Sequence, residues 1–195
     1  MNLRRLTAPS IAALALTLTL AACGSDHSMT DTTSANQEVS GFNTADIEFA
    51  QGMIAHHEQA IEMAEIALDP NAGASAEVID LATRIKGAQD PEVTLMTGWL
   101  TTAGRPVAMD MSDGHDMSTM DGMMSADQMD EMAAMTGAEF DQVWLGMMIA
   151  HHEGAIKQSQ AAKNNGSNAD VRALADQIIS DQQAEITEME ALLTS

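Results

Sequence analysis

The sequence predicts an all-α protein, a four-helix bundle made of two copies of one helical hairpin. Apolar residues recur at three- and four-residue steps along the long stretches of the chain, as on one face of an α-helix. The composition agrees, because 17 Met accompany only 3 Phe, 2 Trp and no Tyr. A core of aliphatic side chains and methionine suits helices better than sheets. The third observation is a long motif that occurs twice.

The first 22 residues are predicted to be a lipoprotein signal peptide. Arg4 and Arg5 precede an apolar run that is too short to span a membrane comfortably. Small residues then lead directly into Cys23, the single cysteine of the chain. This order resembles a bacterial lipobox more than an ordinary secretory signal with a chance cysteine. We therefore expect lipidation at Cys23 and an extracytoplasmic, membrane-anchored protein, with residues 23–42 as a flexible tether.

The charge of the chain excludes several classes of partner. Asp and Glu number 29 against 8 Lys and Arg, which gives a net charge of −21. Nucleic acid is excluded because phosphate binding needs clustered basic residues. Electrostatic attachment to anionic lipid is excluded for the same reason. An acidic surface attracts cations instead.

The predicted domain covers residues 43–194 and opens with a helical hairpin. Its first helix is expected over 44–68, with Thr44 as a cap and a Pro- and Gly-containing turn after it. Its second helix is expected over about 75–100. Pro91 should kink that helix, because the proline ring clashes with the preceding turn.

A Met-rich loop and a short helix are expected before the second hairpin. Residues 101–124 lack periodicity, and Ser125 then begins a capping-box sequence that opens the short helix. A second capping-box sequence begins at Thr136 and opens a long helix that reaches about Lys163. The last helix is expected from about residue 167 to 193.

The two hairpins share their sequence pattern. The motif of the first helix returns 95 positions later, and the matches in the second helix are 93 positions apart. Two matched hairpins that pack together would face each other about a pseudo-two-fold axis. In the first pair of helices, Asp46, Phe49, Met53, Ile54, Ala55, His56, His57, Glu58, Ala60 and Ile61 match Asp141, Trp144, Met148, Ile149, Ala150, His151, His152, Glu153, Ala155 and Ile156. In the second pair, Leu81, Ile85, Gln89, Glu92, Met96 and Leu100 match Leu174, Ile178, Gln182, Glu185, Met189 and Leu193.

The paired histidines are the first candidate for chemistry. Each pair follows a methionine by three and four residues, so imidazole and thioether groups lie toward one helix face. Such groups together can bind a soft or borderline metal ion. Zinc is less attractive because no HExxH motif is present. The candidate ligands in the two copies are Met53, His56, His57, Met148, His151 and His152.

Two other interpretations of the histidines are kept. In one, the histidines are hydrogen-bonded core residues whose partners are Gln89, Glu92, Gln182 and Glu185. In the other, the two glutamates and the histidines form a di-metal oxidase site of ferritin type, holding iron or manganese. That site departs from the usual pattern, because the chain has His-His-Glu in place of Glu-x-x-His.

The Met-rich segment between the hairpins is the second candidate. Nine methionines and His115 fall within residues 109–135, interleaved with aspartates. Met129, Met132 and Met135 have helical spacing and are expected to pack in the core. The earlier methionines lie in a Gly-, Asp- and Ser-rich stretch, where binding of Cu(I) by thioethers explains them better. The aspartate spacing does not match an EF-hand.

Taken together, these motifs resemble the bacterial family catalogued as domain of unknown function 305. The doubled His-His motif carries the resemblance, with residues 120–124 before its second copy and residues 182–189 after it. The resemblance implies a ferritin-like bundle, secretion and, for some members, periplasmic copper binding. It adds Met120, Met123 and Met124 to the implied ligands. Gln158 and Ser159 depart from the first copy, which has Met63 and Ala64 there.

The sequence therefore favours a lipid-anchored protein that sequesters or hands on Cu(I) through Met and His, rather than an enzyme. The di-metal oxidase and a metal-free structural or interaction module stand as the alternatives.

Overall fold

The computed structural model of the chain describes residues 41–109 and 120–195. The predicted signal peptide, Cys23, nearly all of the tether and His115 with its neighbouring methionines lie outside these residues. The described residues contain five α-helices and one short 3-10 helix, which confirms the all-α class. These elements are α1 (Thr44–Leu68), η1 (Pro70–Ala72), α2 (Ala76–Thr102), α3 (Ala126–Ala133), α4 (Ala138–Asn165) and α5 (Ala169–Leu193).

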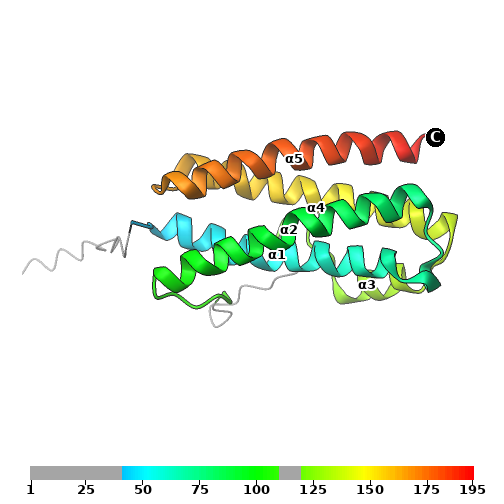
Figure 1. Cartoon of the computed structure of the whole chain (residues 1–195), viewed down its shortest axis with the longest axis horizontal. Helices are drawn as coiled ribbons and strands as arrows, with labels where there is room; N and C mark the ends of the chain where they lie inside the picture. Colours follow the sequence, from blue (N-terminus) through cyan, green and yellow to red (C-terminus); the bar gives the residue numbers. More distant parts are fainter. Residues whose placement is uncertain (1–40, 110–119) are drawn as a thin grey trace, which may run out of the picture. The chain divides into compact units, whose positions relative to one another are not determined.

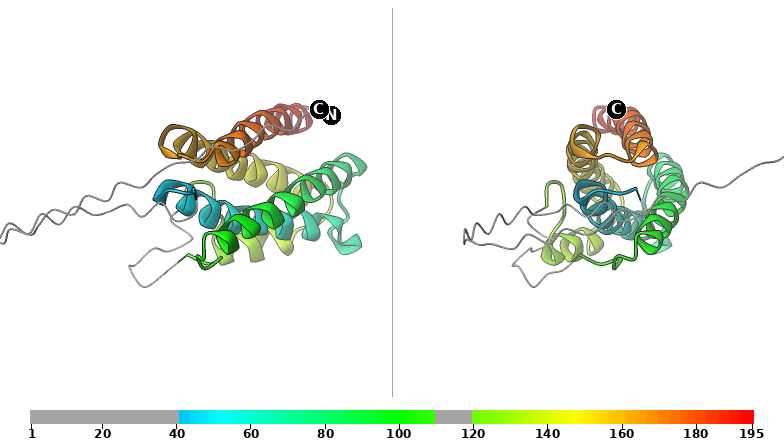
Figure 2. Two further views of the ribbon diagram at one scale, coloured as in Figure 1. Left: turned by 60° about the vertical axis from the view of Figure 1, so that its left-hand side comes forward. Right: turned by 90° about the vertical axis from the view of Figure 1, so that its left-hand side faces the viewer.

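The four long helices pair as two hairpins. α1 packs along α2, α4 packs along α5, and the two hairpins meet through α1 and α4 (Figure 1). The same pairs lie side by side in the other two views (Figure 2). α2 runs without a break through Pro91. The short helix α3 packs against α4.

Side-chain caps set the helix starts, with two corrections to the predictions. Asn43, not Thr44, caps α1, and Asp46 completes a capping box with it. Ser125 forms the predicted capping box of α3 with Gln128. The capping box predicted at Thr136 is wrong. Gly137 occupies the cap position of α4 at a φ of 64°, and it has no side-chain oxygen to accept from the first turn. Its own N–H donates to the Ala72 carbonyl at 2.8 Å.

Two matched aspartates lock the hairpins together. Asp46, at the start of α1, accepts from the backbone N–H of Ser167 at 3.2 Å and of Asn168 at 3.1 Å. Asp141, at the start of α4, accepts from the Ser75 N–H at 3.2 Å. Each carboxylate thereby satisfies donors ahead of the other hairpin's second helix, where anions are favourable. α1 and α4 must consequently run antiparallel.

The core consists of two apolar clusters with the histidines between them along the chain. One cluster takes Ala60–Ala67 of α1 and Phe140–Met148 of α4. The other takes Phe49–Ile54 of α1 and Ala155–Ala162 of α4. The histidine pairs at 56–57 and 151–152 fall between these stretches on both helices. The middle of the α1–α4 interface is therefore polar, whereas its two ends are apolar.

Candidate metal centre

All four motif histidines are buried, with no exposed surface. His56 and His151 meet across the α1–α4 interface, with their ring centroids 3.8 Å apart. His57 and His152 point instead to the second helix of their own hairpin. Consecutive residues diverge by about 100° on a helix, so one histidine of each pair faces the other hairpin and one faces its own.

The histidines that face their own hairpin each bind a glutamate. His57 Nε2 lies 2.7 Å from Glu92 Oε2, and His152 Nε2 lies 2.8 Å from Glu185 Oε2. Both glutamates are largely buried. An ionised carboxylate can only accept, so Nε2–H of each imidazole is the donor in this pair. Carboxylate-bound imidazoles of this kind are typical of metal-ligating histidines, where the acceptor fixes the tautomer and ring orientation.

His56 has the same orientation with a different acceptor. Its Nε2 lies 3.2 Å from the Asp121 carbonyl oxygen. Nδ1 of His56, His57 and His152 has no hydrogen-bond partner, and neither ring nitrogen of His151 has one. Three of the four imidazoles thus direct one nitrogen to an oxygen acceptor and keep the other unpaired.

Most of the buried polar atoms that have no hydrogen-bond partner in the described chain belong to the four histidines and two glutamines. Within the described residues, ten buried side-chain nitrogen or oxygen atoms have no hydrogen-bond partner, and eight of them belong to matched positions of the two hairpins. Buried polar groups usually have partners, so such a concentration needs an explanation, and an unseen ion or water is one of the usual ones. The eight atoms belong to His56, His57, Gln89, His151, His152 and Gln182.

Burial keeps the facing imidazoles neutral. Burial lowers the pKa of His56 to about 3, against the smaller raising effect of the Asp121 carbonyl. Burial, and then the neighbouring His56, lowers the pKa of His151 well below its usual value. Both rings therefore carry lone pairs at neutral pH, which is the form that binds metal ions.

The described residues contain no group of three or more His, Cys, Asp or Glu side chains placed to hold a metal ion. A centre here would need to combine few imidazoles with sulfur. Met53 and Met148 are fully buried, one turn before the histidines on the same helices. A mixed set of imidazole and thioether ligands suits Cu(I) better than Zn, Fe or Mn.

Residues 120–124, named here the crossing segment, lie across α1 and α4 beside the histidines. The Gln59 side chain donates to the Met124 carbonyl at 2.9 Å and accepts from the Met124 N–H at 2.7 Å. On α4, Gly154 makes room for the segment. A Cβ there would lie 2.8 Å from Gly122 Cα and would overlap the Asp121 carbonyl. Gly122 itself has a φ of 83°, which glycine adopts readily.

Met109 and Met120 both approach α1 at Gly52. A Cβ on Gly52 would lie 3.3 Å from Met120 Cε and 4.0 Å from Met109 Sδ. Gln51 holds the approach to Met109 by donating to the carbonyls of Pro106 at 2.8 Å and Ala108 at 3.3 Å. Two thioethers are thus gathered over one turn of α1.

The structure brings most of the predicted site residues into one region. His56 and His151 meet in the middle of the α1–α4 interface, and His57 and His152 bind Glu92 and Glu185. Met53 and Met148 lie one turn before the histidines along their helices, each in a different apolar cluster. Gln89 and Gln182 are buried, but neither binds a histidine. Met123 and Met124 are half-buried in the crossing segment. The sequence analysis did not single out Gln59 and Gly154. These residues occupy the same position in the two copies of the motif, and their difference could have revealed them.

The sequence profile described as Domain of unknown function (DUF305) matches residues 46–193. The chain belongs to the DUF305 family. A DUF305 protein from Streptomyces coelicolor, assigned as secreted, has a solved structure similar to this one, with 28% identity, a TM-score of 0.70, and coverage of 77% of this chain and 91% of that one. A DUF305 fragment from Deinococcus radiodurans is 27% identical, with a TM-score of 0.70 and coverage of 78% and 97%.

Structures of a protein named CopM are also similar to this DUF305 chain. CopM in its Cu(II)-bound form is 32% identical, with a TM-score of 0.64 and coverage of 76% of this chain and 95% of that one. CopM has also been solved bound to Cu(I) and to Ag. No curated protein matches the chain. Among the described residues, no helix is both long and apolar enough to cross a membrane.

Proposed function

We propose that this DUF305 protein binds Cu(I) in the middle of the α1–α4 interface and sequesters it or hands it on. The observation that carries the proposal is the set of eight buried, unpaired polar atoms at matched positions of the two hairpins. Nδ1 lone pairs of the histidines and the thioethers of Met53 and Met148 would be the ligands. Copper is the cargo here, and no redox reaction is assigned to it.

Three further features support this proposal. Glu92 and Glu185 fix the orientation of His57 and His152, as outer carboxylates do around metal-bound imidazoles. The crossing segment contacts His56 through the Asp121 carbonyl, and its Met120, Met123 and Met124 would supply further thioether ligands. CopM, which is 30–32% identical over most of this chain, binds Cu(I) and Cu(II).

We also infer a cellular setting and a fold subtype for the protein. The signal-like residues 1–22, followed by Cys23, support an exported lipoprotein whose acyl chains hold it at a membrane. Residues 23–42 would then be a tether for the domain at 43–194. The two hairpins and their matched positions support a ferritin-like four-helix bundle that arose by internal duplication.

One observation favours a metal-free role instead. The His57–Glu92 and His152–Glu185 pairs tie each hairpin together and would stabilise a purely structural core. The two functions differ in their response to metal. A structural module melts at the same temperature with Cu(I) or with a chelator, whereas a ligand at 100 times its dissociation constant adds about 2.7 kcal/mol.

The proposal is tested by titrating the purified protein with Cu(I) under anaerobic, reducing conditions against bicinchoninate as a competing chelator. The double variant His57→Gln/His152→Gln should lose tight binding while circular dichroism shows retained helix. The matched control is Glu58→Gln/Glu153→Gln, which changes the adjacent exposed residue of both motif copies and should bind as the wild type does. Undiminished binding by the histidine variant would exclude this centre.

A second variant tests the sulfur ligands. Met53→Leu/Met148→Leu keeps the core volume, so the stability should fall by less than about 1.5 kcal/mol for each site. Its affinity for Cu(I) should fall about 10- to 100-fold, because leucine offers no soft ligand. Competition titration measures the affinity and a thermal melt measures the stability. Unchanged affinity would assign the binding to other residues.

A further inference from the structure

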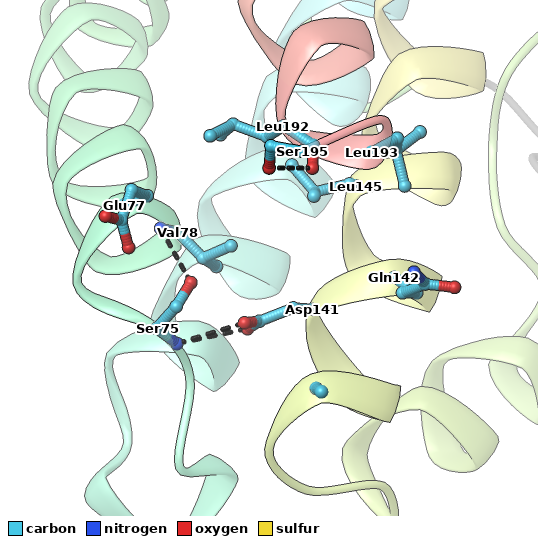
Figure 3. A pocket seen from close by; sticks show the side chains of 10 residues that line it. Ser75, Glu77, Val78, Asp141, Gln142, Leu145, Leu192, Leu193 and Ser195 are labelled. Atoms are coloured by element: carbon cyan, nitrogen blue, oxygen red, sulfur yellow. Dashed lines mark hydrogen bonds between the residues drawn. The ribbon is translucent and has the colours of Figure 1, made fainter.

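A pocket of about 510 Å³ lies where the start of α2, the start of α4 and the end of α5 meet (Figure 3). Val78, Leu145 and Leu192 give it apolar walls. Glu77 and Asp141 add carboxylates, and Asp141 is held in place by the Ser75 N–H. The pocket lies beside the apolar cluster that contains Phe140–Met148 of α4, and no histidine lines it.

The opposite end of the bundle shows what fills the matched space. There Phe42, directly before the Asn43 cap, packs against Trp99 near the end of α2, with ring centroids 6.3 Å apart. Phe42 is only 8% exposed. The matched positions at the pocket are Gly137 and Leu192. A Cβ on Gly137 would meet no atom within 4 Å, so this end has room where the other end holds an aromatic pair.

The chain has no aromatic side chain left to occupy the pocket. Residues 1–40 and 110–119 contain no Phe, Trp or Tyr. The chain has 3 Phe and 2 Trp. Four of these five are buried in the core, and Trp99 packs against it. An aromatic occupant must therefore come from another molecule, and a second copy has none to offer.

The negative charge of the pocket lining indicates which side chains flank the aromatic ring of the occupant. The pocket lining contains two carboxylates and no lysine or arginine, and the whole chain carries a net charge of −21. A basic partner would be attracted over a distance and would gain favourable charge pairs at the pocket, whereas an acidic partner would be repelled. Binding hot spots are enriched in Trp, Tyr and Arg side chains that fill well-packed pockets.

We infer that this pocket docks a partner polypeptide through one aromatic side chain flanked by lysine or arginine. The partner's ring takes the place that Phe42 and Trp99 fill at the opposite end of the bundle, and its basic residues face Glu77 and Asp141. This docking surface is independent of the copper centre.

The probe is the fluorescein-labelled peptide Lys-Lys-Trp-Lys-Lys, titrated with the purified protein and followed by fluorescence anisotropy. The tryptophan peptide should bind saturably. Lys-Lys-Ala-Lys-Lys should bind about tenfold more weakly, because the ring contributes most of the apolar contact. The variant Leu192→Trp places an indole at the position that matches Trp99. It should weaken binding of the tryptophan peptide at least about tenfold. Leu95→Trp, an exposed position far along α2, is the matched control and should bind as the wild type does.

A second measurement on the unaltered protein covers the case in which Leu192→Trp fails to fold. The peptide should shift the backbone amide resonances of Ser75 and Val78 more than those near the histidines. Equal binding of the alanine peptide, or unchanged binding by folded Leu192→Trp, would overturn the inference, since attraction would then be purely electrostatic. Binding of free tryptamine without binding of the peptide would overturn it in favour of a small aromatic amine.

Discussion

The α1–α2 and α4–α5 hairpins carry the same histidine–glutamate pair but differ where the crossing segment lies on them. His57–Glu92 and His152–Glu185 agree within 0.1 Å in their N–O distances, at 2.7 and 2.8 Å. Two residues after this histidine, α1 has Gln59, which binds the Met124 backbone, whereas α4 has Gly154, which makes room for Asp121 and Gly122. A single segment cannot contact both hairpins in the same way. The matched positions therefore differ where that segment is held.

The largest expected effect comes from filling the space at Gly154. Gly154→Ala should lower the free energy of unfolding by about 1–3 kcal/mol, because the new Cβ overlaps the Asp121 backbone. Gly146→Ala, on the same helix with nothing within 4 Å of its Cβ, should raise it by about 0.5–1 kcal/mol through helix propensity. Urea unfolding measures both. If both variants raise the free energy of unfolding equally, the crossing segment does not pack on α4 as described.

The next effect concerns the shared histidine layer. Burial lowers the pKa of His56 to about 3 and that of His151 well below normal. The unfolded chain, with a histidine pKa near 6.5, then binds more protons than the folded chain, so metal-free stability is full above pH 6.5 and falls as the pH drops. We expect a loss of about 2 kcal/mol per pH unit between pH 6 and 5. Unfolding at several pH values measures it, and His151→Leu should flatten the slope. A wild-type slope of zero would contradict the neutral, buried pair.

The smallest effect on stability is expected where Gln59 of α1 binds the crossing segment. Gln59→Ala removes two hydrogen bonds to Met124 and should cost about 1 kcal/mol, since Gln59 is half-buried and water can replace part of the contact. Faster amide hydrogen exchange at Met124 is the direct readout. Glu62→Ala, an exposed change one turn along α1, serves as the control. If both variants exchange alike, Gln59 does not hold the segment.

Periodicity and repetition predicted much of the molecule. The predicted helix over 44–68 is observed at the same residues, and the others begin or end within two residues of their predicted limits where limits were given. Of the matched residues, His56 and His151 contact each other, and His57 and His152 bind Glu92 and Glu185. The capping box predicted at Thr136 is wrong, because Gly137 occupies the cap position and its N–H donates to Ala72, a residue far away in the sequence. Local capping patterns do not contain such a contact.

The chain's own residues determined its helical class and its two hairpins, since the spacing of apolar residues along each helix is a local property. Only the tertiary structure decided which histidine of each pair faces its own glutamate and which faces the other hairpin. It also decided that Asp46 and Asp141 cap the opposite hairpin, that one segment crosses at Gln59 and Gly154, and that one end of the bundle holds an aromatic pair while the other is open. These depend on how two helices meet in space, where a rotation of one residue, about 100°, changes every partner.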